Sequence, residues 1–124
     1  MRKIIFLIAV IMIGCTQMQD TDKTDEIVGL WYFTDIACYE DGVEQRVSTD
    51  REYILFEEDG TGFFDSKPIL WERDYQFLLL SDQLTEESEY VEIKTISDKI
   101  LVLYWQVETE HYLWERFETY RKVK

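Results

Sequence analysis

The chain has 124 residues and carries 26 acidic against 13 basic side chains, which gives a formal net charge of −13 at neutral pH. Nothing in it offers the basic stripe that neutralises phosphates, so nucleic-acid binding is excluded from the expected functions. Strong acidity mainly serves solubility, but it also permits a cationic partner.

The first fourteen residues have the organisation of a secretory signal. Two basic residues precede an uninterrupted apolar run over residues 4–13, which is too short to cross a hydrocarbon core of about 30 Å. The MIGC segment at residues 12–15 resembles a bacterial lipobox, in which the cysteine sulfur is lipidated and the chain is cut just before it. The resemblance implies a signal peptide over residues 1–14 and lipidation at Cys15. The alternatives are an ordinary signal peptide with a chance cysteine and an uncleaved anchor.

Residues 15–26 separate this leader from the next apolar run. They are polar and acidic and contain no aromatic side chain, so they cannot bury enough apolar surface to fold, and we expect a lipidated, flexible tether. Cleavage after residue 14 removes two basic residues and leaves a net charge of −15. We therefore expect the protein in the cell envelope, lipid-anchored to a bacterial membrane, with the outer membrane favoured and the leaflet left open.

From residue 27 onward, short β-rich runs alternate with turn-forming residues. Residues 43–50 are polar and predict an irregular connection, and residues 81–88 predict a loop. The Asp59-Gly60 pair predicts a two-residue type I′ hairpin turn, in which both central residues need positive φ, and a further turn is expected near Arg73-Asp74. The predicted strands are residues 29–40, 52–57, 61–66, 69–72, 75–80, 90–96, 100–107 and 112–123.

Eight strands at intervals of about ten residues, joined by short turns, predict an antiparallel meander, and no segment shows helical periodicity. Eight such strands can close on themselves, which removes exposed sheet edges. We therefore predict an all-β fold, a single small antiparallel up-and-down β-barrel of about eight strands over residues 27–124. The alternatives are a β-sandwich and a half-open barrel.

Several short motifs resemble those of small bacterial lipocalin-like lipoproteins. They are the GLW entry at residues 29–31, the FEEDGTG hairpin at residues 56–62, LWE at residues 70–72, the DKILVL turn and strand at residues 98–103, and YRKV at residues 120–123. The resemblance extends over most of residues 27–124, although the chain is shorter than the larger lipocalins and lacks their Thr-Asp-Tyr turn. It implies a lipocalin-like barrel that binds and does not catalyse.

The resemblance also implies a structural pair at the closed end of the barrel. In lipocalins a tryptophan plugs this end, and a basic residue of the last strand lies across its ring in a cation–π contact of about 0.5–2 kcal/mol. Trp31 matches that tryptophan, with Arg121 as the first and Arg116 as the second choice for the cation. This pair would be structural and would touch no ligand.

Two functions suit a barrel of this size. In the first, a small apolar or amphipathic ligand occupies its open end. An eight-stranded barrel is just wide enough for one small ligand or for its own side chains, so the same inward residues also suit a filled core. The expected lining residues are Phe56, Phe63, Trp71, Phe77, Leu79 and Trp105.

In the second function, the barrel is a monomeric scaffold whose acidic loops bind a cationic envelope protein. Complementary charge would speed the encounter and make binding sensitive to salt. The loops are residues 43–50, 81–88 and 108–111. Their acidic side chains include Glu44, Asp82, Glu86, Glu87, Glu108 and Glu110.

Residues for catalysis or cofactor binding are not identifiable in this sequence. His111 is the single histidine, in a polar turn where we expect it at the surface. With Cys15 lipidated, Cys38 has no disulfide partner and is expected to be a small buried side chain. The carboxylates at residues 57–59 lack the spacing of a calcium loop. We therefore expect no enzymatic activity, no catalytic residue, no metal and no cofactor.

Overall fold

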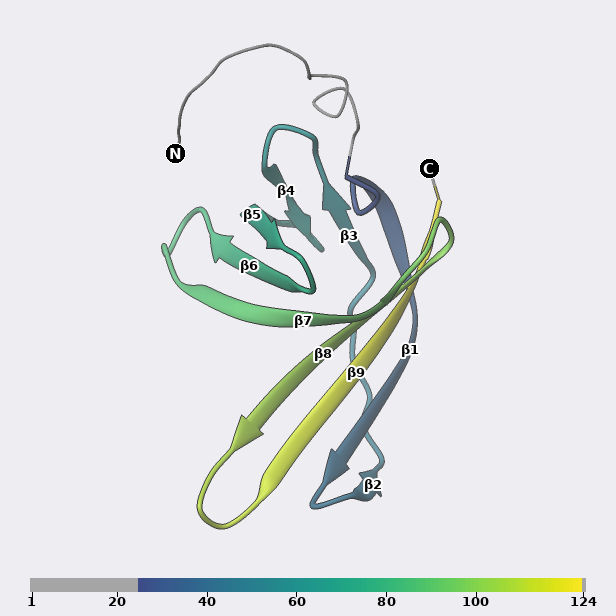
Figure 1. Cartoon of the computed structure of the whole chain (residues 1–124), viewed down its shortest axis with the longest axis vertical. Coiled ribbons are helices and arrows are strands. Elements are labelled where there is room, and N and C mark those ends of the chain that lie inside the picture. The colour runs from purple at the N-terminus through teal and green to yellow at the C-terminus, as the bar shows by residue number, and fades with distance from the viewer. Residues whose placement is uncertain (1–24, 124) are drawn as a thin grey trace.

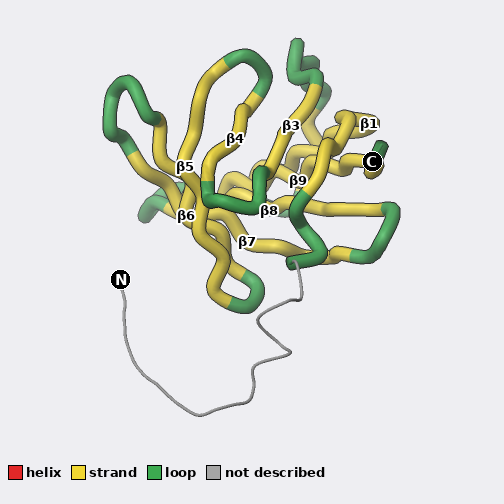
Figure 2. The backbone as a smooth tube through the Cα atoms, turned by 90° about the horizontal axis from the view of Figure 1, so that it is seen from above, coloured by secondary structure: helices red, strands yellow, loops and turns green. Residues whose placement is uncertain are grey.

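The computed structural model describes residues 25–123, which form nine strands and no helix (Figures 1 and 2). The signal peptide, Cys15 and most of the tether lie outside these residues. The strands are β1 Gly29–Glu40, β2 Val43–Gln45, β3 Tyr53–Phe56, β4 Thr61–Phe64, β5 Lys67–Asp74, β6 Phe77–Asp82, β7 Ser88–Ile96, β8 Ile100–Glu108 and β9 Leu113–Lys122.

The sheet closes on itself through β1. Strands β3 to β9 pair with their sequence neighbours in antiparallel fashion, and β1 pairs with β3 on one edge and with β9 on the other. The result is an eight-stranded closed barrel, with the three-residue β2 as an additional strand beside β1. The predicted up-and-down barrel is confirmed, and the sandwich and half-open alternatives are excluded. Strand β2 lies within the segment for which we expected an irregular connection.

Three strands, β1, β8 and β9, extend beyond the barrel. The second half of β1 continues past β3 to pair with β2 at Cys38–Glu40, and β8 and β9 continue beside it to the turn at residues 109–112. Figure 1 shows this extension projecting from the barrel. We call it the arm and define it as residues 35–45 and 105–117. A register shift between Phe33 and Asp35 marks where β1 enters the arm, and such bulges increase the local twist of a strand pair.

Two turns differ from those predicted. At Asp59-Gly60 only Gly60 has a positive φ (92°), and its N–H donates to the Glu57 carbonyl at 3.1 Å, so the loop is longer than a two-residue turn. The two successive positive φ values of a type I′ turn occur instead at Asp41 and Gly42 (53° and 84°), between β1 and β2. An Asp-Gly pair therefore fits either turn, and the pairing of the flanking strands decides between them.

The turn between β5 and β6 lies at Tyr75-Gln76 rather than at Arg73-Asp74. Asp74 pairs directly with Phe77, and Tyr75 adopts a positive φ of 58°. The Arg73 guanidinium holds this turn, because its Nε donates to the Tyr75 carbonyl at 2.6 Å and its Nη1 donates to Asp25 at 2.8 Å. Arg73 thereby connects the turn to the start of the described chain.

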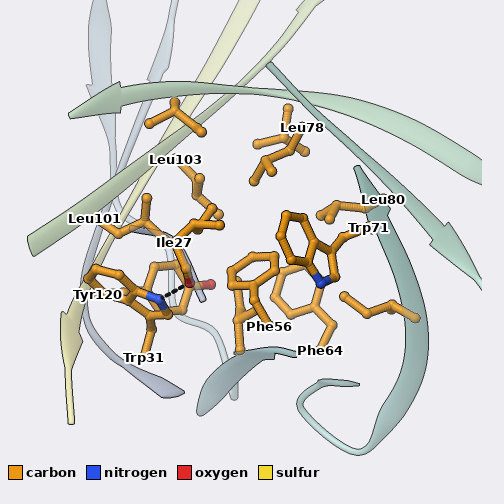
Figure 3. Packing of buried hydrophobic residues seen from close by; sticks show 14 residues of the cluster. Ile27, Trp31, Phe56, Phe64, Trp71, Leu78, Leu80, Leu101, Leu103 and Tyr120 are labelled. Atoms are coloured by element: carbon orange, nitrogen blue, oxygen red, sulfur yellow. Dashed lines mark hydrogen bonds between the residues drawn. The ribbon is translucent and has the colours of Figure 1, made fainter. Parts of the chain in front are cut away.

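Side chains fill the interior of the barrel. Trp31 is fully buried, and its indole N–H donates to the Ile27 carbonyl at 2.8 Å, so Ile27 and Trp31 together plug one end. Figure 3 shows the aromatic and aliphatic side chains that pack beside this plug. The buried cluster comprises Ile27, Trp31, Ile54, Phe56, Phe64, Ile69, Trp71, Leu78, Leu80, Val91, Ile93, Leu101, Leu103 and Tyr120.

The second glycine of the DGTG segment is required by close packing of β3 against β4. A Cβ atom at Gly62 would lie 2.0 Å from the Leu55 carbonyl oxygen, whereas one at Gly42 would meet no atom within 4 Å. We expect Gly62→Ala to reduce the free energy of unfolding by about 3 kcal/mol through overpacking. Gly42→Ala should cost about 1 kcal/mol, because only its positive φ is unfavourable. Denaturant unfolding of both variants checks this order, and equal losses would contradict it.

Candidate functional site at the barrel mouth

The end of the barrel opposite the Trp31 plug, which we call the mouth, is hollowed by a cleft of about 250 Å³. Its floor consists of three side chains that are buried and belong to the core cluster, Phe64, Ile69 and Leu80. Its rim is polar and comes from the start of β5, the end of β6, the loop that follows β6 and the start of β7. The rim residues are Lys67, Ser81, Asp82, Glu87, Ser88 and Glu89.

The loop between β6 and β7 is held in place by its own hydrogen bonds. The Asp82 carboxylate accepts the backbone N–H groups of Leu84 at 2.7 Å and Thr85 at 3.1 Å. These bonds favour the charged form and hold the pKa of Asp82 below its ordinary value. The Gln83 amide donates to the Ile69 carbonyl at 2.9 Å. The acidic side of the rim therefore has a defined position relative to the apolar floor.

Two cations and two aromatic rings lie beside the cleft. The Phe64 and Trp105 rings are nearly parallel, with centroids 6.5 Å apart. The Arg51 guanidinium lies 3.8 Å over Phe64 and the Arg116 guanidinium 4.4 Å over Trp105. The Trp105 indole N–H donates to the Glu89 carboxylate on the rim at 2.8 Å. These contacts connect the rim of the cleft to the charged groups deeper in the barrel.

Those charged groups surround Glu118, whose side chain is only 1% exposed. Its Oε1 accepts the Tyr120 hydroxyl at 2.5 Å and the Arg51 Nε at 3.3 Å. The Arg116 Nε lies 3.1 Å from Oε2, but its N–H does not point at the carboxylate and has no hydrogen-bond acceptor. Arg51 also contacts Asp65 at 3.3 Å. A buried carboxylate is thus compensated by two guanidinium groups, as burial of charge requires.

Burial and these charges shift the pKa values of neighbouring groups. Desolvation, followed by the negative charge of Glu118, raises the pKa of Tyr120 far above its ordinary value. Burial alone would lower the pKa of Arg51, but the attraction of Glu118, its hydrogen bond to Arg51 and the charges of Tyr120 and Asp65 together outweigh burial and raise that pKa. Cys38, opposite Arg116 in the register, is buried, and desolvation raises the pKa of its thiol. At neutral pH the tyrosine and the thiol are therefore protonated.

The buried cluster and the rim differ in net charge. Arg51 and Arg116 balance Glu118 and Asp65, so the cluster is electrically neutral, although the Arg116 Nε has no hydrogen-bond acceptor. The rim has Asp82, Glu87 and Glu89 against Lys67, whose ammonium is 3.8 Å from Asp82. A ligand in the cleft would therefore meet an apolar floor and an acidic rim, which favours a cationic group on an apolar body.

The cation over Trp31 is Lys122, not Arg121 or Arg116. The Lys122 ammonium lies 5.2 Å from the ring centroid and also donates to the Glu26 carbonyl at 3.1 Å. Trp31 is directly opposite Lys122 in the β1–β9 register, whereas Arg121 is opposite Tyr32 and is exposed. Side chains alternate between the two faces of a strand, so a one-residue error in register exchanges inside for outside.

The same alternation divides the expected ligand-lining residues. Phe56 and Trp71 are buried in the core cluster, and Trp105 packs against it. Phe63 and Phe77 are 39% and 50% exposed on the outer surface, and Leu79 has the same outward parity as Phe77. Their neighbours Phe64, Leu78 and Leu80 occupy the inward positions instead. Runs of consecutive apolar residues conceal this parity, because either face then looks hydrophobic.

The three acidic loops do not form one surface. Figure 1 shows β2 and the turn between β8 and β9 at the end of the arm, whereas the loop between β6 and β7 lies at a separate edge of the barrel. Glu44, Glu108 and Glu110 thus belong to the arm, and Asp82, Glu86 and Glu87 to the loop at the mouth. His111 is exposed at the tip of the arm, 3.4 Å from Glu110. Cys38 is buried, as expected.

Arg51, Glu118 and Tyr120 are not among the site residues predicted from the sequence. A signal was present, because residues 116, 118 and 120 place Arg, Glu and Tyr at alternate positions of one strand. It was obscured by Phe117 between them, which is an outer residue covered by Tyr39 and Tyr104 at centroid distances of 6.0 and 4.8 Å. Arg51 comes from the connection before β3, and only the fold brings it to β9.

This chain matches no protein-family model, no curated protein and no solved structure. Within residues 25–123, no group of three or more His, Cys, Asp or Glu side chains is placed to hold a metal ion. The same residues include no helix with the length and hydropathy of a membrane span.

The Glu118 carboxylate should be a major contributor to stability. We expect Glu118→Gln to lower the free energy of unfolding by about 3 kcal/mol, because two partly buried guanidinium groups lose the buried carboxylate that they share. The exposed Glu72→Gln is the control and should change it by less than about 0.5 kcal/mol. A double-mutant cycle with Arg51→Met in denaturant unfolding measures the coupling directly. Equal effects of the two glutamine variants would show that the cluster is not a stabilising unit.

Proposed function

We propose that this protein is an exported, lipocalin-like lipoprotein, anchored to the envelope by lipid on Cys15, that binds a small amphipathic molecule bearing a cationic group. The leader at residues 1–14, followed by Cys15, supports the anchor, and the closed eight-stranded barrel is compatible with the binding role. The role is binding rather than catalysis. The observation that carries the proposal is the mouth cleft, with its apolar floor and acidic rim.

The cleft is the preferred location because the interior below it is filled. Phe56, Trp71 and Leu103 lie in the core that extends from the mouth toward Trp31. A cleft of about 250 Å³ is smaller than the usual range of roughly 300–1,000 Å³ for pockets that enclose a drug-sized ligand. It therefore suits a short ligand, or one end of a longer one, with its apolar part on Phe64, Ile69 and Leu80.

Charge selects among amphipathic ligands of equal apolar size. Glu87 and Glu89 are exposed on the rim, and the excess of acids over the single Lys67 opposes an anionic head group. An ammonium group should gain from the same arrangement, although exposure to water keeps this gain modest. We expect a single-chain alkylammonium to bind about tenfold more tightly than the alkyl carboxylate of equal length, which corresponds to about 1.4 kcal/mol.

Trp105 provides the measurement, because its ring lies against Phe64 of the cleft floor. Each amphiphile is titrated below its micelle concentration while tryptophan fluorescence is followed, and Trp105→Phe should abolish the fluorescence change but not binding seen by calorimetry. Replacing Glu87 and Glu89 together by Gln should remove the preference for the ammonium. The matched control replaces Glu57 and Glu58, at the β3–β4 turn, by Gln. Equal affinity for both amphiphiles, or none for either, would refute the proposal.

The anchor is tested separately. We expect the full chain, expressed in a bacterium, to incorporate labelled fatty acid and to fractionate with membranes, because a cysteine with two chains and an acylated amine is firmly held. Cys15→Ser should lose the label and the membrane association, whereas Cys38→Ser should retain both. Label that persists in Cys15→Ser would contradict lipidation at this residue.

A further inference from the structure

Strands β7 and β8 separate at the base of the arm. Their pairing begins at Ile96 with Leu101 and ends at Glu92 with Tyr104. Beyond that point, the first residues of β7 pair only with β6, and residues 105–108 of β8 pair only with β9. Figure 1 shows β8 continuing into the arm while β7 turns toward β6. Among residues 25–123, no strand covers the outer edge of β8 at residues 105–108.

The hydrogen-bonding parity shows which groups this edge presents. The Thr109 N–H donates to the Tyr112 carbonyl at 2.9 Å, and at the other end of the hairpin the Lys122 N–H donates to the Lys99 carbonyl at 2.9 Å. Odd-numbered residues of β8 therefore bond to β9, and even-numbered residues point away from it. The backbone N–H and C=O groups of Gln106 and Glu108 accordingly face outward along the free edge.

Apolar side chains lie beside this edge on the inner face of the arm. Val107 is 51% exposed, and it borders an open hollow of about 490 Å³ formed with Glu40, Tyr112 and Trp114. A strand added to β8 would place every second side chain on this face. The hydrogen bond from Trp105 to Glu89 connects β8 and β7 close to the point where the two strands separate. It leaves residues 106–108 accessible.

The acidic side chains around this edge determine which kind of strand can bind to it. Glu108 and Glu110 lie on the arm, and Glu89 and Glu92 lie on β7 across the separation. The nearby cations are engaged, since Lys94 is 3.3 Å from Glu92 and Arg116 is 3.1 Å from Glu118. A second copy of β8 would bring its own Glu108 and Glu110 to this acidic region, which is unfavourable between like charges. A basic segment is complementary.

We propose that the free edge of β8 binds an extended basic peptide segment of another protein as an added β-strand. Main-chain hydrogen bonds to Gln106 and Glu108 hold the segment, and its apolar residues at alternate positions lie against Val107. Lysine or arginine residues between them lie on the opposite face, which carries Glu92 and Glu108. Glu89 belongs both to the rim of the mouth cleft and to the carboxylates beside this edge, but Gln106 and Glu108 do not line the cleft, so this proposal does not depend on the ligand proposed there.

The test uses the full-length lipoprotein in nonionic detergent and a labelled eight-residue peptide of alternating Lys and Val with blocked ends. Fluorescence anisotropy should show binding that weakens as salt is raised. Gln106→Pro removes an outward N–H that no bond within the sheet uses, so it should weaken binding at least tenfold, while Gln106→Ala should remain within twofold of the natural protein. A peptide methylated on alternate backbone nitrogens should also lose at least tenfold.

Three results would overturn the proposal. Equal binding of the methylated and unmethylated peptides would mean that charge alone attracts the peptide, whatever the fold of the proline variant. Equal binding by Gln106→Pro and Gln106→Ala would exclude this edge. A dimer in sedimentation analysis that Gln106→Pro dissociates would mean that a second copy occupies the edge. Ligand binding at the mouth is unaffected by each of these results, so the two proposals fail independently.

Discussion

The structure depends on β1, because its pairing with β3 on one edge and with β9 on the other closes the barrel. β1 pairs along its length with β9, and its other edge is divided between β3 near Trp31 and β2 near Cys38. Because β1 completes the barrel on both sides, the plug, the packed interior and the arm all require it. Closure explains how a chain of this size avoids exposed edges over most of its sheet. The remaining free edges include residues 105–108 of β8 in the arm and the first residues of β7, where these two strands separate.

The interior changes character from one end to the other. Around Trp31 it is filled by apolar side chains, and a cation is present only at the margin, where Lys122 reaches the ring. Toward the mouth, Glu118 and Arg116 occupy inward positions on β9, and Arg51 reaches Glu118 from the connection before β3. Buried ion pairs contribute little net stability compared with apolar packing, although removal of one partner is costly. These charged groups lie near the mouth cleft, so this end of the barrel combines polar and apolar side chains, whereas the end near Trp31 is almost entirely apolar.

The class of fold could be predicted from the sequence because its signals are local. Short β-rich runs, turn residues and the absence of helical periodicity are all properties of neighbouring residues, and they led to the closed barrel. Site residues depended on register instead. Lys122 rather than Arg121 meets Trp31, and Phe64 rather than Phe63 faces inward, because bulges and turn lengths set the parity of each strand. Arg51 is 67 residues from Glu118 in the chain, a separation for which no local pattern exists.

The Arg73 contacts have a mechanical consequence. Asp25 is the point at which the N-terminal segment enters the domain, and Arg73 links it to the Tyr75 carbonyl, while Ile27 is held by the indole of Trp31. Force applied through the N-terminus would therefore load this ion pair and the buried plug before it could peel β1 from β9. Residues from β5 and the β5–β6 turn thereby reinforce the attachment point. Force from the N-terminal side is distributed over several strands instead of acting on the β1–β9 pair alone.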